Sequence, residues 1–264
     1  MRRAVTLTAP ILLSALMLSG FSSQEIVVGR RRAAAASGPP SGMLIWYRGD
    51  SLTCTGGCSG TNPVTAFVDK STHSNNASLH GGATAGTYVA SGYGGRPGVA
   101  FDGSTTSYDF SAVNLETAGT VCLVYSNTAV LQRGTLFAGN NFSLGYQTNA
   151  NPGGGAKQQV GTSDNSTFLG GSTSSPDTNP HSACMTYASG GSAPQLNFYL
   201  DGSSDGSVTV STSLSGTNSC IGSDSCVGTR NIFFKGTLYE LLAWDSVLSA
   251  GDISAWFAYT SWWY

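Results

Sequence analysis

The chain has 264 residues with 35 glycines, and only 10% of its residues are charged, against roughly 25% in typical globular domains. This composition excludes a coiled coil or a charged disordered tail and points to many turns between short strands. Without the first 32 residues, 7 bases and 13 acids remain, a net charge of −6, so the folded part lacks the basic surface that binds a phosphate backbone, and nucleic acid is not an expected partner.

The start of the chain has the features of a secretory signal peptide. A short basic stretch precedes an apolar run over residues 4–20, which small residues follow. We place the signal peptide at residues 1–23, with its cleavage site open because an Ala-x-Ala site at 33–36 also fits, and a linker at residues 24–42. A signal anchor is the alternative, since the run is just at the lower length limit for spanning a bilayer. We expect a secreted or cell-surface protein that does not insert into the membrane once the signal is removed.

Six cysteines in an exported chain indicate disulfide bonds, although the sequence alone does not fix their connectivity. Cys54 and Cys58 lie in one Gly-rich turn, and Cys220 and Cys226 lie in another, so a local bridge is sterically easy in each. The remaining two cysteines would then form a long-range pair. A zinc site is the alternative, but no histidine stands at ligand spacing from a cysteine pair.

Short apolar or alternating runs, bounded by Gly, Asn and Asp, recur from residue 44 onward. Such runs are typical of β-strands, and the sequence shows no fixed-period repeat of the kind found in propellers and solenoids. The expected strands are 44–47, 98–101, 120–125, 135–138, 183–187, 195–200, 207–210, 232–234 and 238–244. Three Asp-Gly pairs, at 102–103, 201–202 and 205–206, predict hairpin-type turns.

One helix is expected near the end of the chain, over residues 249–258. Ser249 is a helix-capping residue and Asp252 stands at the third position, which is the pattern of a capping box. Three apolar residues recur at helical spacing and would bury one face of the helix: Ile253, Trp256 and Phe257. We expect the aromatic end of the chain, Trp262–Tyr264, to pack under this helix; an exposed contact patch is the alternative.

Four segments follow the first expected strand in a fixed order and spacing. They are Asp69–Ala77 (DKSTHSNNA), Gly98–Gly103 (GVAFDG), Phe198–Gly202 (FYLDG) and Phe234–Ile253. They resemble the segments D-x-S-G-N-x-N, a-l-x-F-D-G and l-Y-v-D-G and the closing strand and helix of laminin-G-like, concanavalin-like jelly rolls, which include the pentraxins. The resemblance covers nearly the whole mature chain. It implies an all-β fold over residues 43–264, a two-sheet antiparallel jelly-roll sandwich with one short C-terminal helix.

The similarity to pentraxins also bears on a disulfide bond and on a metal site. The segments around Cys122 and Cys184 are similar to the two strands that pentraxins join, although the second has an extra residue and Tyr187 where the pentraxin pattern has Trp. The segments in the places of the pentraxin calcium loops, 131–134 and 223–226, offer one carboxylate, which is too few for Ca²⁺. The resemblance thus implies a Cys122–Cys184 bridge, and the pentraxin calcium site is not expected.

The sequence does not predict an enzyme. Glucanases of this fold use two carboxylates on alternate residues of one strand, because both must reach the same glycosidic bond. After the leader the only glutamates are Glu116 and Glu240, and no such pattern exists. Glu240 has Leu238 and Leu242 as its expected neighbours on the same face. A serine hydrolase would need a supported histidine and a G-x-S-x-G turn; His181 only begins a strand, and the motif is missing.

The expected function is non-catalytic contact with an extracellular glycan or protein surface, as in a lectin-like or adhesion module. A self-assembling structural subunit of a surface or fibre is the alternative, and a glycoside-active enzyme is less favoured. Tyrosines in the rim loops would stack on a sugar and asparagines would hydrogen-bond its hydroxyls. The candidate residues are Asn75, Asn76, Tyr93, Tyr108, Tyr146 and Asn149.

This function requires no cofactor. If a metal contributes, the best candidate is Ca²⁺ bound by Asp69 with Asn75 and Asn76, because a carboxylate and two side-chain amides cluster there. In the alternative interpretation these side chains hydrogen-bond their own turn.

Overall fold

A computed structural model describes residues 38–111, 117–128, 134–139, 142–147, 157–162, 168–170, 177–189, 195–209, 218–226 and 228–261. For residues 142–147, 157–162 and 168–170 only the backbone is described. The predicted signal peptide, most of the predicted linker and the terminal residues 262–264 therefore lie outside the described part of the chain, and the predictions made for them are not tested.

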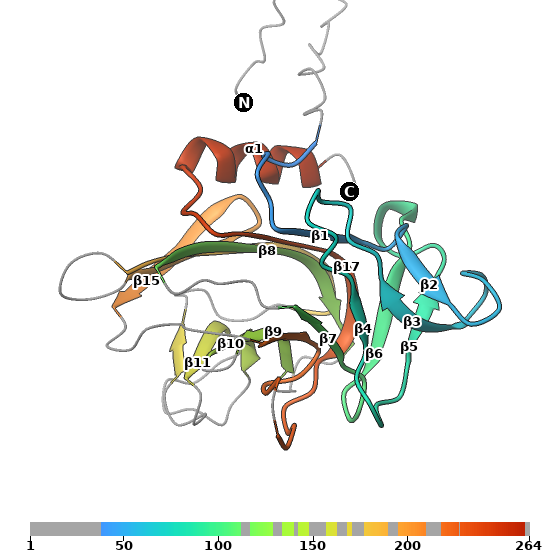
Figure 1. Cartoon of the computed structure of the whole chain (residues 1–264). Helices are drawn as coiled ribbons and strands as arrows, with labels where there is room; N and C mark the ends of the chain where they lie inside the picture. The colour runs from blue at the N-terminus through green and yellow to red at the C-terminus, as the bar shows by residue number, and fades with distance from the viewer. Residues whose placement is uncertain are drawn as a thin grey trace, which may run out of the picture. The chain divides into compact units, whose positions relative to one another are not determined.

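The described strands form two layers (Figure 1). The first sheet has the spatial order β17 (Lys235–Trp244), β8 (Ala118–Asn127), β13 (Pro180–Ala188), β14 (Gln195–Leu200) and β15 (Ser203–Thr209). On the other side of β17, β6 (Gly98–Asp102) pairs with its first part and β1 (Ile45–Arg48) with its second part. The second sheet consists of β4 (Ala77–Leu79), β7 (Tyr108–Ser111), β16 (Asn218–Ile221), β9 (Gly134–Gly139), β10 (Phe142–Gln147), β11 (Lys157–Thr162) and β12 (Phe168–Gly170).

Three further strands connect the layers: β2 (Leu52–Cys54), β3 (Pro63–Phe67) and β5 (Gly86–Val89). Strand β3 pairs with β4 and β5, and β5 pairs with β6 of the first sheet. Every pair of these named strands is antiparallel, which confirms the predicted all-β, two-sheet jelly-roll sandwich.

Strand β8 is buried on both faces because it lies between two cores. Val121, Leu123 and Tyr125 face the large core between the sheets. Cys122 and Val124 face a second, smaller core beneath the C-terminal helix. A strand covered on both sides has a nearly continuous apolar sequence, so β8 could be predicted from the sequence.

The C-terminal helix α1 (Ala250–Thr260) lies across the outer face of the first sheet, above β8 and β17 (Figure 1). The Ser249 hydroxyl accepts from the Asp252 backbone N–H, and the Asp252 carboxylate accepts from that of Ser249, so the predicted capping box is confirmed. The three predicted apolar residues of the helix are all buried in the smaller core.

Strand β17 contains a bulge that changes which side chains face the helix. Leu238 pairs with Tyr125 and Glu240 pairs with Val124, so Tyr239 is an extra residue in the ladder. Leu238 consequently faces the core between the sheets, whereas Glu240 faces α1. The prediction that these two residues share one face is wrong, because a bulge shifts the alternation by one residue.

The predicted Asp-Gly turn at 201–202 is confirmed, and the one at 205–206 is wrong. Residues 201–202 join β14 to β15 with φ of 48° and 86°, the left-handed conformation of a tight hairpin turn. In β15, Gly206 pairs with Phe198 and Ser204 with Tyr199, so Asp205 is the extra residue of a bulge within the strand.

Two other expected elements are replaced by irregular structure. The Asp-Gly pair at 102–103 begins a loop between β6 and β7. In this loop the Asp102 carboxylate accepts from the backbone N–H groups of residues 104–106. The expected strand 232–234 forms only an isolated bridge, between Phe233 and Thr135. Side-chain hydrogen bonds to the backbone replace a hairpin in the first case.

The structure contains the three predicted disulfide bonds: Cys54–Cys58, Cys122–Cys184 and Cys220–Cys226. Cys122 and Cys184 stand directly opposite each other on β8 and β13, so the longest bridge joins neighbouring strands, as the pentraxin resemblance implies. Three bridges fit a protein that folds in an oxidising compartment.

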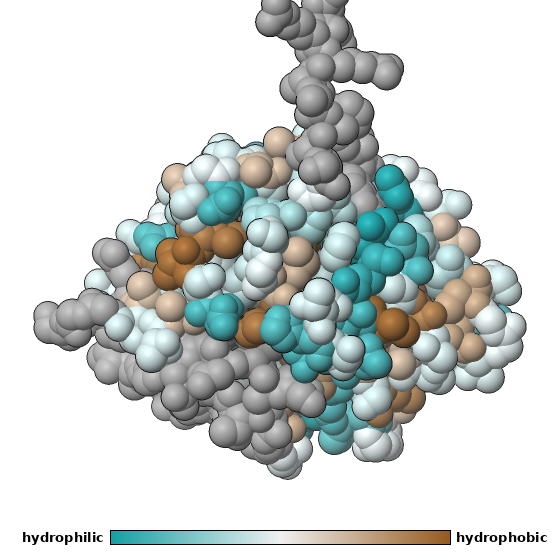
Figure 2. Space-filling view, turned by 45° about the horizontal axis from the view of Figure 1, so that its top comes forward, coloured by the Kyte–Doolittle hydropathy of each residue, from teal (hydrophilic) through white to brown (hydrophobic). Residues whose placement is uncertain are grey.

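Figure 2 shows small apolar areas separated by polar ones on the visible face. The exposed large apolar residues in the described ranges are Val68 and Val247, which belong to different parts of the chain. The one α-helix in those ranges is too short and too polar to cross a membrane.

Candidate functional site

A pocket of about 550 Å³ lies beside the C-terminal end of α1. Its other walls come from the short 3₁₀ helix η1 (Tyr93–Gly95), the start of β13 and the turn between β14 and β15. It is lined by Tyr93, Pro180, His181, Ser182, Asp201, Gly202, Phe257, Ala258, Thr260 and Ser261. We call this pocket the groove.

His181 is held between two carboxylates in the groove. Its Nδ1 lies 2.7 Å from Oδ2 of Asp201, and its Nε2 lies 3.2 Å from Oδ1 of Asp177. The imidazole is mostly buried, with 14% of the side chain exposed, while the two carboxylates are about half exposed. The histidine is therefore fixed in place, and the acidic groups face solvent on either side of it.

The turn after β14 explains why Asp201 reaches His181. The left-handed conformation of the Asp201–Gly202 turn folds the chain back, and the Asp201 backbone N–H donates to the Ser182 carbonyl at 2.8 Å. The Ser182 N–H donates in return to Oδ1 of Asp201 at 2.9 Å. These reciprocal bonds lock the aspartate onto the start of β13.

The electrostatic balance favours the protonated form of His181. Partial burial alone lowers the pKa of His181, but the hydrogen bonds and negative charges of Asp201 and Asp177 outweigh it and raise the pKa above its ordinary value. The pKa of Asp177 is lowered, chiefly because its carboxylate accepts from the Asn179 backbone N–H at 2.6 Å.

Tyr93 forms the aromatic wall of the groove and is half-buried. Its ring centroid lies 6.3 Å from that of Tyr239, the bulged residue of β17. Burial and the nearby charge of Asp201 raise the pKa of the Tyr93 phenol, so the hydroxyl stays protonated at physiological pH. Gly92 permits this packing, because a Cβ there would lie 2.3 Å from the Tyr239 ring.

The groove offers hydrogen-bond acceptors beside apolar surface. The exposed hydroxyl of Ser261 donates to the Ala258 carbonyl of α1 at 2.8 Å, so its oxygen remains an acceptor. The carboxylate of Asp201 adds further acceptor positions. A ligand suited to this groove therefore has several donors and an apolar face.

Of the predicted ligand-binding tyrosines, the structure places only Tyr93 in the groove. Tyr108 is fully buried between the sheets, where its hydroxyl donates to the Val64 carbonyl and accepts from the Gly86 N–H, both at 2.8 Å. Its ring cannot stack on a sugar, so that prediction is wrong. The side chain of Tyr146 and the whole of Asn149 lie outside the described residues.

The predicted calcium loop is closed by its own hydrogen bonds. The Asp69 carboxylate accepts from the backbone N–H groups of Trp46, Ser71 and Asn75 and from the Ser71 hydroxyl. The Asn75 side chain donates to the Leu44 carbonyl, and Asn76 Oδ1 accepts from the Asp69 N–H. Both asparagines lie outside the groove lining. The alternative interpretation, a self-bonded turn, accounts for these contacts, and the residues do not converge as oxygen ligands.

Sequence reasoning missed the carboxylate support of histidine. The structure gives His181 two carboxylate partners and His80 one, Asp109, which corrects the expectation that no histidine is supported. The hairpin formed by β13 and β14 accounts for the contact of His181 with Asp201. Pairing of the two strands brings His181, the residue before Ser182, next to the turn residue Asp201. The sequence predicts a role for Asp201 only in the turn. Its contact with His181 depends on the pairing of β13 with β14, which the sequence does not specify.

Comparison with known proteins identifies the same fold. The family profile of the Concanavalin A-like lectin/glucanases superfamily matches residues 101–254. Domain 4 of AbnA, an extracellular arabinanase from Geobacillus stearothermophilus, solved in complex with arabinotriose, is similar with a TM-score of 0.57 and 14% identity, over 81% of this chain and 97% of that one. A comparison with curated protein sequences finds no match.

Two further solved structures are similar over part of their own length. An α-L-arabinofuranosidase mutant soaked with 4-nitrophenyl α-L-arabinofuranoside has a TM-score of 0.57 and 13% identity, over 83% of this chain and 59% of that one. The binding domain of botulinum neurotoxin serotype D has a TM-score of 0.53 and 8% identity, over 82% and 51%. At these identities the likeness concerns the fold, and with the profile match it leads to one conclusion: this chain belongs to the Concanavalin A-like lectin/glucanases superfamily.

Proposed function

We propose that this protein is an extracellular, non-catalytic module that binds a glycan in the groove. The observation that carries the proposal is the fixed His181, held by Asp201 and Asp177, in a groove that the aromatic side chain of Tyr93 also lines. A sugar ring has an apolar face that packs on an aromatic side chain and hydroxyls that donate to fixed acceptors. The groove provides both kinds of contact.

The size and rigidity of the groove support this function. A volume of about 550 Å³ lies within the usual range for ligand pockets, roughly 300–1,000 Å³. The acceptors are held by hydrogen bonds within the protein, so little conformational freedom would be lost when a ligand binds. The three disulfide bonds fit an extracellular setting.

The state of the two carboxylates that hold His181 favours binding over hydrolysis. A glycosidase needs one carboxyl that stays protonated as the acid and a second that acts as base or nucleophile. Asp177 remains ionised because its pKa is lowered, and Asp201 is bonded to both His181 and the Ser182 N–H. These carboxylates orient a histidine, which gives them a structural part in a binding site.

The similar structures are compatible with this proposal. One is a domain solved with arabinotriose bound, and another is a toxin's binding domain. An arabinofuranosidase shares the fold as well, so hydrolysis has to be tested beside binding.

The test is a glycan-array screen of the secreted protein, with the Tyr93→Ala variant beside the wild type. An aromatic contact is worth about 1 kcal/mol, so we expect Tyr93→Ala to weaken binding of the array hits by roughly fivefold. The matched control is Tyr88→Ala on β5, a partly buried tyrosine outside the groove, which should bind as the wild type does. Release of reducing sugar from any hit by the purified protein would overturn the non-catalytic claim.

A further inference from the structure

A second pocket, of about 230 Å³, lies away from the groove, between the loop after β4, the turn after β6 and the loop before β17. It is lined by His80, Gly81, Gly82, Ala83, Thr105, Ser107, Gly228, Arg230 and Phe233. None of these residues lines the groove. We call it the His80 pocket.

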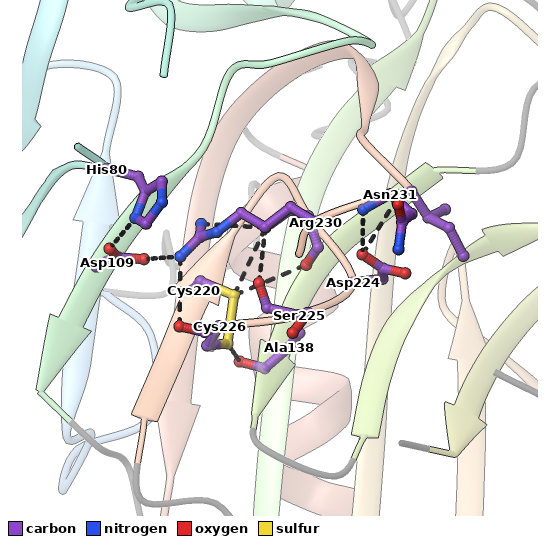
Figure 3. The surroundings of a disulfide bond; sticks show 11 residues. His80, Asp109, Ala138, Cys220, Asp224, Ser225, Cys226, Arg230 and Asn231 are labelled. Atoms are coloured by element: carbon purple, nitrogen blue, oxygen red, sulfur yellow. Dashed lines mark hydrogen bonds and ion pairs between the residues drawn. A yellow bond between two sulfur atoms is a disulfide. The ribbon is translucent and has the colours of Figure 1, made fainter. Parts of the chain in front are cut away.

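Arg230 is the anchor of the His80 pocket. Only 5% of its side chain is exposed, and its guanidinium donates to Oδ1 of Asp109, to the Ser223 hydroxyl and to the Cys226 carbonyl (Figure 3). The Cys220–Cys226 disulfide closes the loop that supplies the last two of these acceptors. A buried arginine tied to so many partners is fixed in orientation.

Asp109 connects the fixed Arg230 to His80. It sits on β7, opposite Ser78 of β4 and Cys220 of β16, so both of its neighbouring strands hold its backbone. One carboxylate oxygen accepts from Arg230, and the other lies 2.6 Å from Nδ1 of His80. Figure 3 shows the three side chains in a row, with the second ring nitrogen of His80 directed away from Asp109.

The row determines what His80 presents. The Asp109 carboxylate accepts from Nδ1 of His80, so in the neutral form of the imidazole Nε2 is the acceptor. Within the described ranges no residue bonds Nε2. The charges of Arg230 and Asp109 cancel each other at the polar side of the pocket. This arrangement favours an uncharged donor such as a hydroxyl.

The lining of the pocket also includes an aromatic side chain and bare backbone. Phe233 is partly exposed there, and a Cβ added at Gly81 or Gly82 would meet no atom within 4 Å. The Thr105 hydroxyl donates to Asp102 at 2.8 Å, so its oxygen is a second acceptor at the edge. The pocket thus combines an aromatic face, open space and two acceptors, in a volume below that of ordinary drug-sized sites.

We propose that the His80 pocket is a second binding site, for one uncharged sugar ring. The ring packs its apolar face on Phe233, and one hydroxyl donates to Nε2 of His80. The size of the pocket suits a single ring, and Arg230 and Asp109 are paired with each other, so neither charge is left to attract a sugar acid or amine. With the groove, this site makes the protein bivalent for glycans, although it stands whether or not the groove binds.

The test is an NMR titration of the His80 imidazole with free D-glucose, D-galactose and L-arabinose, carried out in the Tyr93→Ala background so that the groove does not contribute. We expect at least one of these sugars to shift the imidazole signals in a saturable way. His80→Phe, which removes the acceptor, and Gly81→Leu, which fills the open space, should each weaken binding at least tenfold. His73→Phe, at an exposed histidine outside the pocket lining, should leave it unchanged.

Three results would overturn the proposal. The first is that no probe sugar shifts the His80 signals. The second is that His80→Phe and Gly81→Leu, each shown by circular dichroism to be folded, bind as tightly as His73→Phe. The third is tighter binding of glucosamine or glucuronic acid than of glucose, because the paired charges of Arg230 and Asp109 give the pocket no preference for a charged ring.

Discussion

Glu240 shows how far the surroundings of one residue can change its chemistry. It is 1% exposed beneath α1, where Oε1 accepts from Trp46 Nε1 at 2.6 Å and from the Tyr259 hydroxyl at 3.0 Å. Its Oε2 has no hydrogen-bond partner in the described part of the chain. Burial raises the pKa of Glu240 to about 7, although the Trp46 hydrogen bond and the charge of Arg48 act in the other direction.

This pKa predicts that the protein is more stable in mild acid. The folded state prefers the protonated glutamic acid, so the stabilisation is complete below the unfolded pKa of 4.5 and is lost as the pH rises through about 7. The free energy of unfolding should fall by about 3 kcal/mol over this range. Urea unfolding at a series of pH values measures it.

Glu240→Gln is the matched variant for the pH experiment. The amide keeps an acceptor for Trp46 and Tyr259 but does not ionise. We therefore expect the fall in the free energy of unfolding with rising pH to shrink markedly. The part of this fall that comes from His181, whose pKa is also raised in the folded state, remains. A variant with the same pH profile as the wild type would show that Glu240 is not the source.

At the scale of elements, α1 depends on its cap as well as on its apolar face. Ser249→Ala removes the acceptor for the Asp252 N–H, which lies 3.1 Å from the Ser249 hydroxyl oxygen. We expect a loss of about 1 kcal/mol in the free energy of unfolding. Ser254→Ala is the control, because this exposed hydroxyl bonds only within the helix, to the Ala250 carbonyl. Equal losses in the two variants would contradict the role of the cap.

The two kinds of disulfide should differ in their effect on stability. Cys122–Cys184 closes a loop with a sequence separation of 62, and Cys54–Cys58 one with a separation of 4. In the chain-entropy model, replacing both cysteines by alanine costs about 4 kcal/mol for the long loop and about 2 kcal/mol for the short one. Denaturant unfolding of the two double variants measures the difference; a larger loss for the short loop would refute the ordering.

At the scale of the whole molecule, the long strands and the helix were predictable and the finer sheet geometry was not. Strands β8 and β17 carry long apolar runs because both of their faces are covered. The bulges at Asp205 and Tyr239 leave no clear trace in the sequence, because a bulge is a property of the pairing between two strands. Each one changes which side chains share a face.

The sites were less predictable than the fold for a related reason. Tyr108 could have been assigned to the core, since it alternates with Phe110 on β7 and both are buried, while Asp109 between them faces His80 and Arg230. The groove, in contrast, joins η1, β13, the turn after β14 and α1, which are far apart in the chain. Only Tyr93 was found from the sequence.

The central claim is that the groove binds a glycan through acceptors fixed on His181. Isothermal titration calorimetry of the strongest array hit tests it most directly, with Asp201→Asn compared against Asp245→Asn, an exposed aspartate outside the groove. Asparagine at 201 loses the charge that holds the imidazole, so we expect affinity to fall at least tenfold, while Asp245→Asn binds as the wild type does. Equal affinity in the two variants would contradict the account.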